Sequence, residues 1–308
     1  MKKFIIHLCI FAVIVFISIF LILLQADGYA DPYYLRFTAP KQTSLILGTS
    51  RAAQGIQPQI INTLLNRNDL YNFSFTIGTS PYGPTFLKSV KQKLDTNTQT
   101  GIFILAVDPW SISSSGEDPD NEDMFEERKL FLSTTKNINV HPNIPYLLKN
   151  FDDPYYKILF NKIPVSFIKQ TRLHQDGWLE VLNDFNHKQI QHNTAQRVKE
   201  YRTQYLPRYS FSQTRLFYLT ETIVYLKKYG EVFLVRLPVS EEIKLIDNQL
   251  ISDFSEKMDR LATENQIPYI DLTDFGDRLS FTDGIHLSKG SGKEVSEMIA
   301  KWIITFEN

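Results

Sequence analysis

Short apolar runs alternate with amphipathic stretches along most of the chain. The run Gly101–Val107 is apolar throughout, which is typical of a strand buried on both faces of a sheet. Alternation of strands with helices indicates a mainly parallel sheet covered by helices on both faces. The sequence therefore predicts a three-layer α/β/α sandwich. Its predicted strands are 44–48, 70–76, 101–107, 231–237 and 268–272, and its predicted helices are 57–66, 86–94, 214–228, 253–265 and 293–306.

This alternation breaks off over residues 111–210. The segment is irregular, polar and aromatic, and it contains an acidic stretch, Glu117–Glu127, that is typical of a solvated loop. No strong apolar strand is apparent in it. We therefore interpret residues 111–210 as a long insertion into one domain that spans residues 43–308.

The N-terminal region has the strongest apolar signal. Residues Phe4–Leu24 contain His7 and the Cys9 thiol as their only ionisable side chains. About 20 residues at ~1.5 Å rise each are enough to cross the ~30 Å hydrocarbon layer of a bilayer. Lys2 and Lys3 precede the run, and basic residues favour the cytoplasmic side.

From this pattern we predict a cytoplasmic tip and membrane anchor at residues 1–24, a juxtamembrane linker at 25–42, and an extracytoplasmic domain at the membrane of a bacterium. The alternative is a cleaved signal peptide, with residues 28–30 as a possible cleavage site. Signal peptides usually have an apolar region of only ~7–15 residues, so the longer run here favours a retained anchor.

Composition excludes several classes of protein. The chain has 33 basic and 34 acidic side chains, so its net charge gives no electrostatic basis for binding nucleic acid. Its single cysteine, Cys9, excludes an intrachain disulfide and a cysteine-rich metal site. Four histidines have no convincing ligand spacing, and we expect neither a metal nor an organic cofactor: His141, His174, His187 and His192.

Candidate site residues follow the predicted strands, because sites in open α/β sheets form beyond the carboxyl ends of the strands. Ser50 follows the first strand, where a strand turns into a helix and the helix amino end favours developing negative charge. A serine hydroxyl is a weak nucleophile and needs a base, usually a histidine oriented by a carboxylate. Asp283 and His286, three residues apart before the last helix, can both face one site.

Taken together, these motifs resemble the SGNH (GDSL-like) hydrolase superfamily. The likeness consists of Gly48-Thr49-Ser50 after the first strand, Gly78 after the second, and the segment Asp283-Gly284-Ile285-His286-Leu287. It covers about residues 44–303, interrupted by the insertion. The α/β-hydrolase pattern, Gly-x-Ser-x-Gly, fits less well because position 52 is Ala.

The resemblance implies a role for each matching residue. Ser50 becomes the nucleophile, His286 the general base, and Asp283 the carboxylate that orients the base. The amides of Ser50 and Gly78 become donors to an oxyanion. The Gly-x-Asn-Asp block of the superfamily is absent, and Asp108 lies in the segment Val-Asp-Pro-Trp that stands in its place.

The missing asparagine has a chemical consequence. Removing one oxyanion donor typically costs about 10²–10³ in turnover, so either activity is reduced or another group supplies the donor. With a membrane anchor, this altered pattern is more similar to envelope O-acylation proteins, such as those of alginate O-acetylation and of D-alanyl transfer to teichoic acid.

Simpler interpretations stand beside these roles. Ser50 alone could be a turn or cap residue, Asp283 and His286 a helix-capping pair, and Gly78 a tight-turn glycine. Other residues at strand ends are possible substrate ligands, although ion pairs or a strand-ending turn also explain them: Arg51, Asp108 and Arg236.

The predicted function is serine-dependent acyl transfer or ester hydrolysis on an extracytoplasmic glycan. Two alternatives remain open. One is an inactive protein of this fold that partners a membrane acyltransferase. The other is a glycan-binding module that uses aromatic residues of the insertion, such as Tyr155, Tyr156 and Trp178. An intact Ser50–His286–Asp283 set favours catalysis, and the missing asparagine favours the alternatives.

Overall fold

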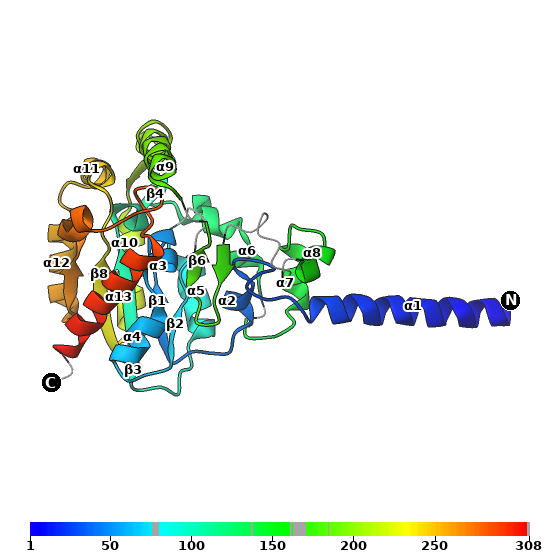
Figure 1. Ribbon diagram of the computed structural model, residues 1–308. Coiled ribbons are helices and arrows are strands. Elements are labelled where there is room, and N and C mark those ends of the chain that lie inside the picture. The colour runs from blue at the N-terminus through cyan, green and yellow to red at the C-terminus, as the bar shows by residue number, and fades with distance from the viewer. Residues whose placement is uncertain (76–79, 137, 161, 163–170, 184, 307–308) are drawn as a thin grey trace.

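A five-stranded parallel sheet forms the centre of the protein (Figure 1). The computed structural model describes residues 1–75, 80–136, 138–160, 162, 171–183 and 185–306. The strands pair in the order β2-β1-β3-β8-β9, and every pairing is parallel. Their bounds are Ser44–Leu47 for β1, Leu70–Asn72 for β2, Gly101–Val107 for β3, Gly230–Arg236 for β8 and Tyr269–Asp271 for β9.

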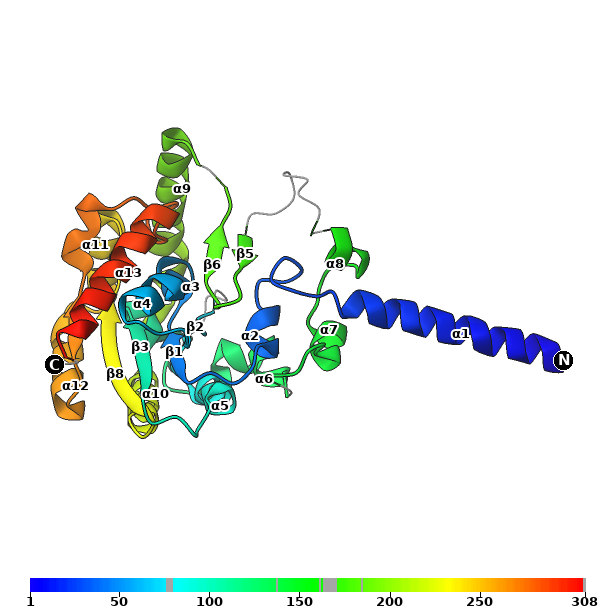
Figure 2. The ribbon, with the colours of Figure 1, turned by 60° about the horizontal axis from the view of Figure 1, so that its bottom comes forward.

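Helices cover both faces of this sheet (Figure 2). Along β3, Phe103 and Leu105 pack into one apolar core, and Ile102 and Ile104 pack into another, because successive side chains of a strand point to opposite faces. The first core is closed by α5, α10 and α12, and the second by α3, α4 and α13. The predicted α/β sandwich with a mainly parallel sheet is therefore confirmed. The helices span Ser50–Gly55 (α3), Pro58–Leu64 (α4), Pro84–Lys93 (α5), Gln213–Leu226 (α10), Phe254–Asn265 (α12) and Lys289–Ile304 (α13).

The close contact of β3 and β8 depends on glycine. Gly230 has a φ of +158°, and a Cβ placed on it would lie 2.0 Å from the carbonyl oxygen of Gly101 on the neighbouring strand. No L side chain fits at that distance, so glycine sets the register at which the two longest strands of the sheet begin.

The helices and strands differ from the sequence prediction at a few places. The strand predicted over 70–76 ends at Asn72 in β2, and the last helix begins at Lys289 instead of residue 293. A further helix, α11 (Glu241–Leu250), follows β8 and was not predicted. It buries Ile243 and Ile246 in a small third core.

The described part of residues 111–210 forms a layer outside the central sheet, with α9 and β4 at the carboxyl end of the sheet and with α6, α7 and α8 beside α2 and toward α1 (Figure 1). They supply two small antiparallel pairs, β4 with β7 and β5 with β6. The longest helix in this layer is α9, which continues into a π-helical turn at Tyr201–Tyr205. The bounds are Ser113–Ser115 (β4), Thr171–Leu173 (β5), Leu179–Val181 (β6), Tyr209–Phe211 (β7), Phe131–Thr134 (α6), Ile144–Lys149 (α7), Tyr156–Phe160 (α8) and His187–Glu200 (α9).

The segment 25–42, expected as a linker, contributes to the core. It contains the short helix α2 (Tyr34–Thr38), all of whose residues are buried. Arg36 is 0% exposed, and its guanidinium donates to the carbonyl oxygens of Pro32 and Gly177. Tyr34 and Phe37 pack in the same core as α5.

Helix α1 (Lys2–Leu23) extends away from the sandwich (Figures 1 and 2). Its mean hydropathy over the most apolar window is 3.1, and that window is not buried by the rest of the protein. Among the described residues it is the one helix long and apolar enough to cross a membrane.

Candidate active site

Ser50 lies at the junction between β1 and α3. Thr49 is the N-cap of α3, and its hydroxyl accepts a hydrogen bond from the amide of Arg51 at 3.3 Å. A Cβ on Gly48 would lie 2.6 Å from the Cβ of Ala52 and 2.9 Å from that of Ala106, so only glycine allows α3 to begin this close to the sheet. The turn leaves Ser50 half-buried at the first position of the helix, beyond the carboxyl end of β1.

Asp283 and His286 lie in a turn before α13. The carboxylate of Asp283 accepts hydrogen bonds from the amides of Ile285 and His286, at 3.2 and 3.0 Å. Gly284 between them has a φ of +82°, in the left-handed region that favours glycine. The Asp-Gly-Ile-His segment therefore folds back on itself, which brings the aspartate carboxylate beside the imidazole.

The structure brings Ser50, His286 and Asp283 together as a chain of hydrogen-bonded side chains. The Nε2 atom of His286 is 2.9 Å from the Ser50 hydroxyl, and its Nδ1 atom is 2.9 Å from Oδ2 of Asp283. Both distances are within hydrogen-bond range. With Nδ1 protonated and donating to Asp283, Nε2 is free to accept the proton of the Ser50 hydroxyl.

Arg197 of α9 completes the surroundings of the carboxylate. Its Nη2 and Nε atoms donate to Oδ2 of Asp283 at 3.1 and 3.3 Å, and its Nη1 atom donates to Glu200 at 2.8 Å. Burial by itself raises the pKa of Asp283. The hydrogen bonds and charge of His286, together with Arg197, act more strongly and hold that pKa well below its usual range. Asp283 is consequently ionised at neutral pH.

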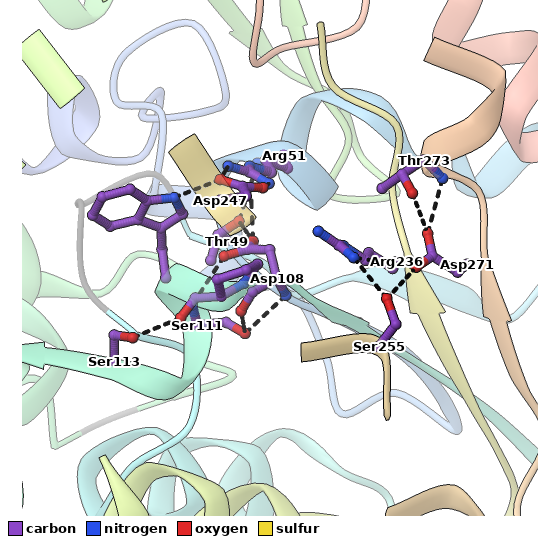
Figure 3. A network of polar contacts seen from close by, with 12 residues as sticks. Thr49, Arg51, Asp108, Ser111, Ser113, Arg236, Asp247, Ser255, Asp271 and Thr273 are labelled. Atoms are coloured by element: carbon purple, nitrogen blue, oxygen red, sulfur yellow. Dashed lines mark hydrogen bonds and ion pairs between the residues drawn. The ribbon is translucent and has the colours of Figure 1, made fainter. Parts of the chain in front are cut away.

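A buried ion-pair network includes Arg51, the residue that follows Ser50 in the chain (Figure 3). Arg51 donates from Nη1 and Nη2 to the two carboxylate oxygens of Asp247, at 2.7 and 3.0 Å. Trp110 donates from its indole nitrogen to the same carboxylate at 2.7 Å. Such a two-pronged contact between guanidinium and carboxylate fixes both side chains, so the network fixes Arg51 next to the serine and Trp110 at the site.

Asp108 joins this network from the end of β3. Its carboxylate accepts from the Thr49 hydroxyl at 3.1 Å and from the Ser111 amide at 2.9 Å, and lies 3.9 Å from Nε of Arg51. Burial raises the pKa of Asp108, and Arg51 opposes that shift. Both of its carboxylate oxygens are therefore already engaged as hydrogen-bond acceptors.

Of the other predicted site residues, Arg236 lies away from Ser50. Arg236, on β8, donates to Ser255 at 2.9 Å and to Asp271 at 3.2 Å, and these residues form a separate group in Figure 3. It does not line the cavity in front of Ser50. Gly78 lies outside the described residues.

The cavity in front of Ser50 has a volume of about 410 Å³. One side of it is aromatic. Trp110 lies 4.7 Å from Tyr201 and 5.6 Å from Tyr209, between ring centroids, and both pairs are nearly perpendicular. Tyr205 extends this cluster, which we call the aromatic wall: Trp110, Tyr201, Tyr205 and Tyr209.

The sequence prediction did not include several of these residues. Tyr201, Tyr205 and Tyr209 recur every four positions, and that helical spacing was a usable signal. Nothing in the sequence pattern connects Arg197 or Asp247 to Ser50. Of the aromatic residues proposed from sequence, Trp178 is 8% exposed and its indole donates to the carbonyl of Gln54.

The chain matches no protein-family model and no curated protein sequence. Among solved structures, it is similar to the lipase/acylhydrolase from Enterococcus faecalis, with 10% sequence identity and a TM-score of 0.38. That alignment covers 84% of this chain and 94% of the other. The functional assignment consequently depends on the geometry of the site.

Proposed function

We propose that this protein is a serine-dependent enzyme of SGNH type that transfers or hydrolyses O-acyl groups. The observation that carries the proposal is the 2.9 Å contact between the Ser50 hydroxyl and Nε2 of His286, whose other nitrogen contacts Asp283. Ser50 attacks the acyl carbonyl while His286 accepts its proton. His286 then protonates the leaving group, and the acyl group remains as an ester of Ser50.

A second acceptor completes the cycle. Water or a hydroxyl group gives its proton to His286 and attacks the acyl ester, and Ser50 recovers a proton from His286 as its bond to the acyl carbon breaks. Asp283 holds the imidazole in the required tautomer throughout. The amide of Ser50, at the beginning of α3, is the donor that we assign to the oxyanion.

The missing asparagine sets the expected rate. The segment Val107–Trp110 has no side-chain amide to donate to an oxyanion, so we expect hydrolysis to be about 10²–10³ slower than with such a donor. This observation also favours the alternative, an inactive protein of the same fold that partners a membrane acyltransferase.

The aromatic wall supports a carbohydrate substrate. Aromatic rings present flat apolar surfaces, which suit the apolar face of a sugar ring. The cavity volume of about 410 Å³ is in the range of small-molecule sites. Helix α1, as an anchor, supports an O-acylated glycan of the cell envelope as the substrate class.

A fluorophosphonate probe tests the nucleophile. The purified full-length protein in detergent should be labelled, and Ser50→Ala should lose the label. Ser133→Ala, which alters an exposed serine of the insertion, should keep it. If the wild type is not labelled, or if Ser50→Ala labels equally, the serine mechanism is wrong and the inactive-partner alternative is favoured.

A further inference from the structure

A second cavity adjoins the first beside His286. Its volume is about 460 Å³, and the residues Gln54, Arg197 and His286 line both cavities. Ser50 lines only the first cavity and Asp283 only the second. The base is therefore part of the wall between two compartments, and each compartment is large enough for a small ligand.

The insertion builds most of this second cavity. Its walls come from β5 and β6, from the segment after β6, and from the exposed face of α9, and β6 packs against α3. Side-chain amides and hydroxyls are prominent among its lining residues: Gln54, Thr171, Asn183, Asn193, Gln196 and Thr282.

The polar groups of this cavity suit an uncharged hydroxyl-bearing ligand. Amides and hydroxyls both donate and accept hydrogen bonds, as sugar hydroxyls do. Phe185 adds an apolar ring to the same wall. The one guanidinium, that of Arg197, is already paired with Asp283 and Glu200, so an anionic ligand gains little from it.

We propose that the second cavity binds a sugar whose hydroxyl group accepts the acyl group. This inference rests on the function proposed above. The acceptor hydroxyl extends past the residues shared by the two cavities toward Ser50, gives its proton to Nε2 of His286, and its oxygen forms a bond to the acyl carbon. The bond from that carbon to Ser50 Oγ breaks, and the serine oxygen takes the proton back from His286. The products are a sugar ester and the free serine.

Separate compartments favour transfer over hydrolysis for a physical reason. Water needs no binding site, whereas an acceptor sugar must be held with its hydroxyl near the acyl carbon, and such positioning raises its effective concentration. A sugar in the second cavity approaches His286 while the acyl donor occupies the first. A sugar bound in the second cavity also excludes water from His286.

The test blocks the second cavity and measures the fate of the acyl group. The full-length protein in detergent receives p-nitrophenyl acetate with glycerol, methyl glucoside, methyl mannoside or N-acetylglucosamine as acceptor. Mass spectrometry gives the ratio of acetylated acceptor to free acetate. Gln196→Trp fills the cavity from α9, and Asn183→Trp fills it from the opposite wall. Gln191→Trp is the matched control, since Gln191 is exposed on α9 and lines neither cavity.

We expect the wild type to acetylate at least one acceptor. The ratio should fall about tenfold or more in Gln196→Trp and Asn183→Trp, because displacing a hydroxyl by about 1 Å already costs a large factor in rate. Gln191→Trp should keep the wild-type ratio. Two results would overturn the acceptor site: no acetylated acceptor is found, or the ratio is unchanged in both blocking variants. If acetate release still depends on Ser50 in either case, the serine mechanism stands. Loss of that dependence on Ser50 would overturn the proposed function itself.

Discussion

Arg197 and His286 bind the same oxygen atom, Oδ2 of Asp283, from opposite parts of the fold. Arg197 donates to it from α9 at 3.1 Å, and Nδ1 of His286 lies 2.9 Å from it. The insertion therefore contributes directly to the charge balance at the site. A cation at this position stabilises the ionised form of Asp283, which the histidine needs as its partner.

Replacing Arg197 should change the pH dependence of activity. Arg197 lowers the pKa of Asp283, so Arg197→Gln raises that pKa. Because the base needs Asp283 ionised as its partner, the acid limb of the pH profile of kcat/KM should move to higher pH. The measurement is p-nitrophenyl acetate turnover from pH 4 to 9. Arg202→Gln, an exposed arginine beyond the end of α9, is the control. If the acid limb of the pH profile lies at the same pH in Arg197→Gln and the wild type, Arg197 has only a structural role.

Ser50, His286 and Asp283 should act as a unit. Ser50→Ala and His286→Ala remove the same step, so each should lower turnover by about 10³ or more and the double variant should be little worse. Asp283→Asn should cost less than either, because the base remains. Steady-state turnover of p-nitrophenyl acetate and glycan O-acylation in cells at equal protein level measure these effects. Additive losses in the double variant would contradict a shared mechanism.

Asp247 should be essential for stability. It is 0% exposed and accepts hydrogen bonds from Arg51 and from Trp110, so Asp247→Ala leaves a buried guanidinium without its main partner. Breaking a buried ion pair in this way typically costs ~3–5 kcal/mol. Urea unfolding of the protein in detergent measures the free energy of unfolding. The control Asp277→Ala, at an exposed position, should change it by less than about 0.5 kcal/mol.

A second substitution tests whether the lost stability comes from the Arg51–Asp247 ion pair itself. Arg51→Met in the Asp247→Leu background should recover part of the lost stability, since apolar replacements of buried ion pairs are often tolerated. If Asp247→Leu and the double variant are equally unstable, the Arg51–Asp247 interaction does not explain the loss.

Lys93 should make stability depend on pH. It is 0% exposed, and burial lowers its pKa to about 7. The unfolded chain keeps the ordinary value near 10.4. Between these two values the unfolded state binds more protons than the folded state, so the free energy of unfolding should rise as pH increases from about 7 to about 10. The rise should be of the order of a few kcal/mol.

Substitution isolates this effect. Lys93→Met should flatten the rise, although it also loses the hydrogen bond that Lys93 donates to the carbonyl of Ala39. Lys88→Met, on an exposed position of the same helix, should leave the slope as in the wild type. Urea titrations at pH 7, 8.5 and 10 give the slopes. Equal slopes in Lys93→Met and the wild type would contradict the buried lysine as their source.

The basic residues Lys2 and Lys3, at the start of α1, predict its orientation. We expect the amino end in the cytoplasm and the α/β domain outside, by the preference of basic residues for the cytoplasmic side. A tag after residue 308 should be digested by protease added to intact spheroplasts, and the protein should sediment with membranes. A protected tag would reject this orientation. A shortened, released protein would instead indicate a cleaved signal.

The sequence by itself determined those features that depend on neighbours along the chain. The apolar run of β3 and the amphipathic helices set the layers, because burial on one or two faces imposes a period on the sequence. Helix α1 followed from length and hydropathy alone. Ser50, and the Asp283–His286 pair, could be predicted because a short turn fixes each locally.

Only the tertiary structure decided which distant residues meet at the site. Arg197 contacts Asp283 across 86 positions and Arg51 contacts Asp247 across 196, and no local period relates such pairs. The insertion carries no strand pattern that indicates where it packs, so neither the second cavity nor the place of the aromatic wall beside Ser50 could be predicted from sequence. The segment 25–42 looked polar, yet α2 is buried, because Tyr34 and Phe37 pack into the core and two backbone carbonyls accept hydrogen bonds from the guanidinium of Arg36. Chain order sets the local turns, whereas packing of side chains from separate elements sets the compartments around His286.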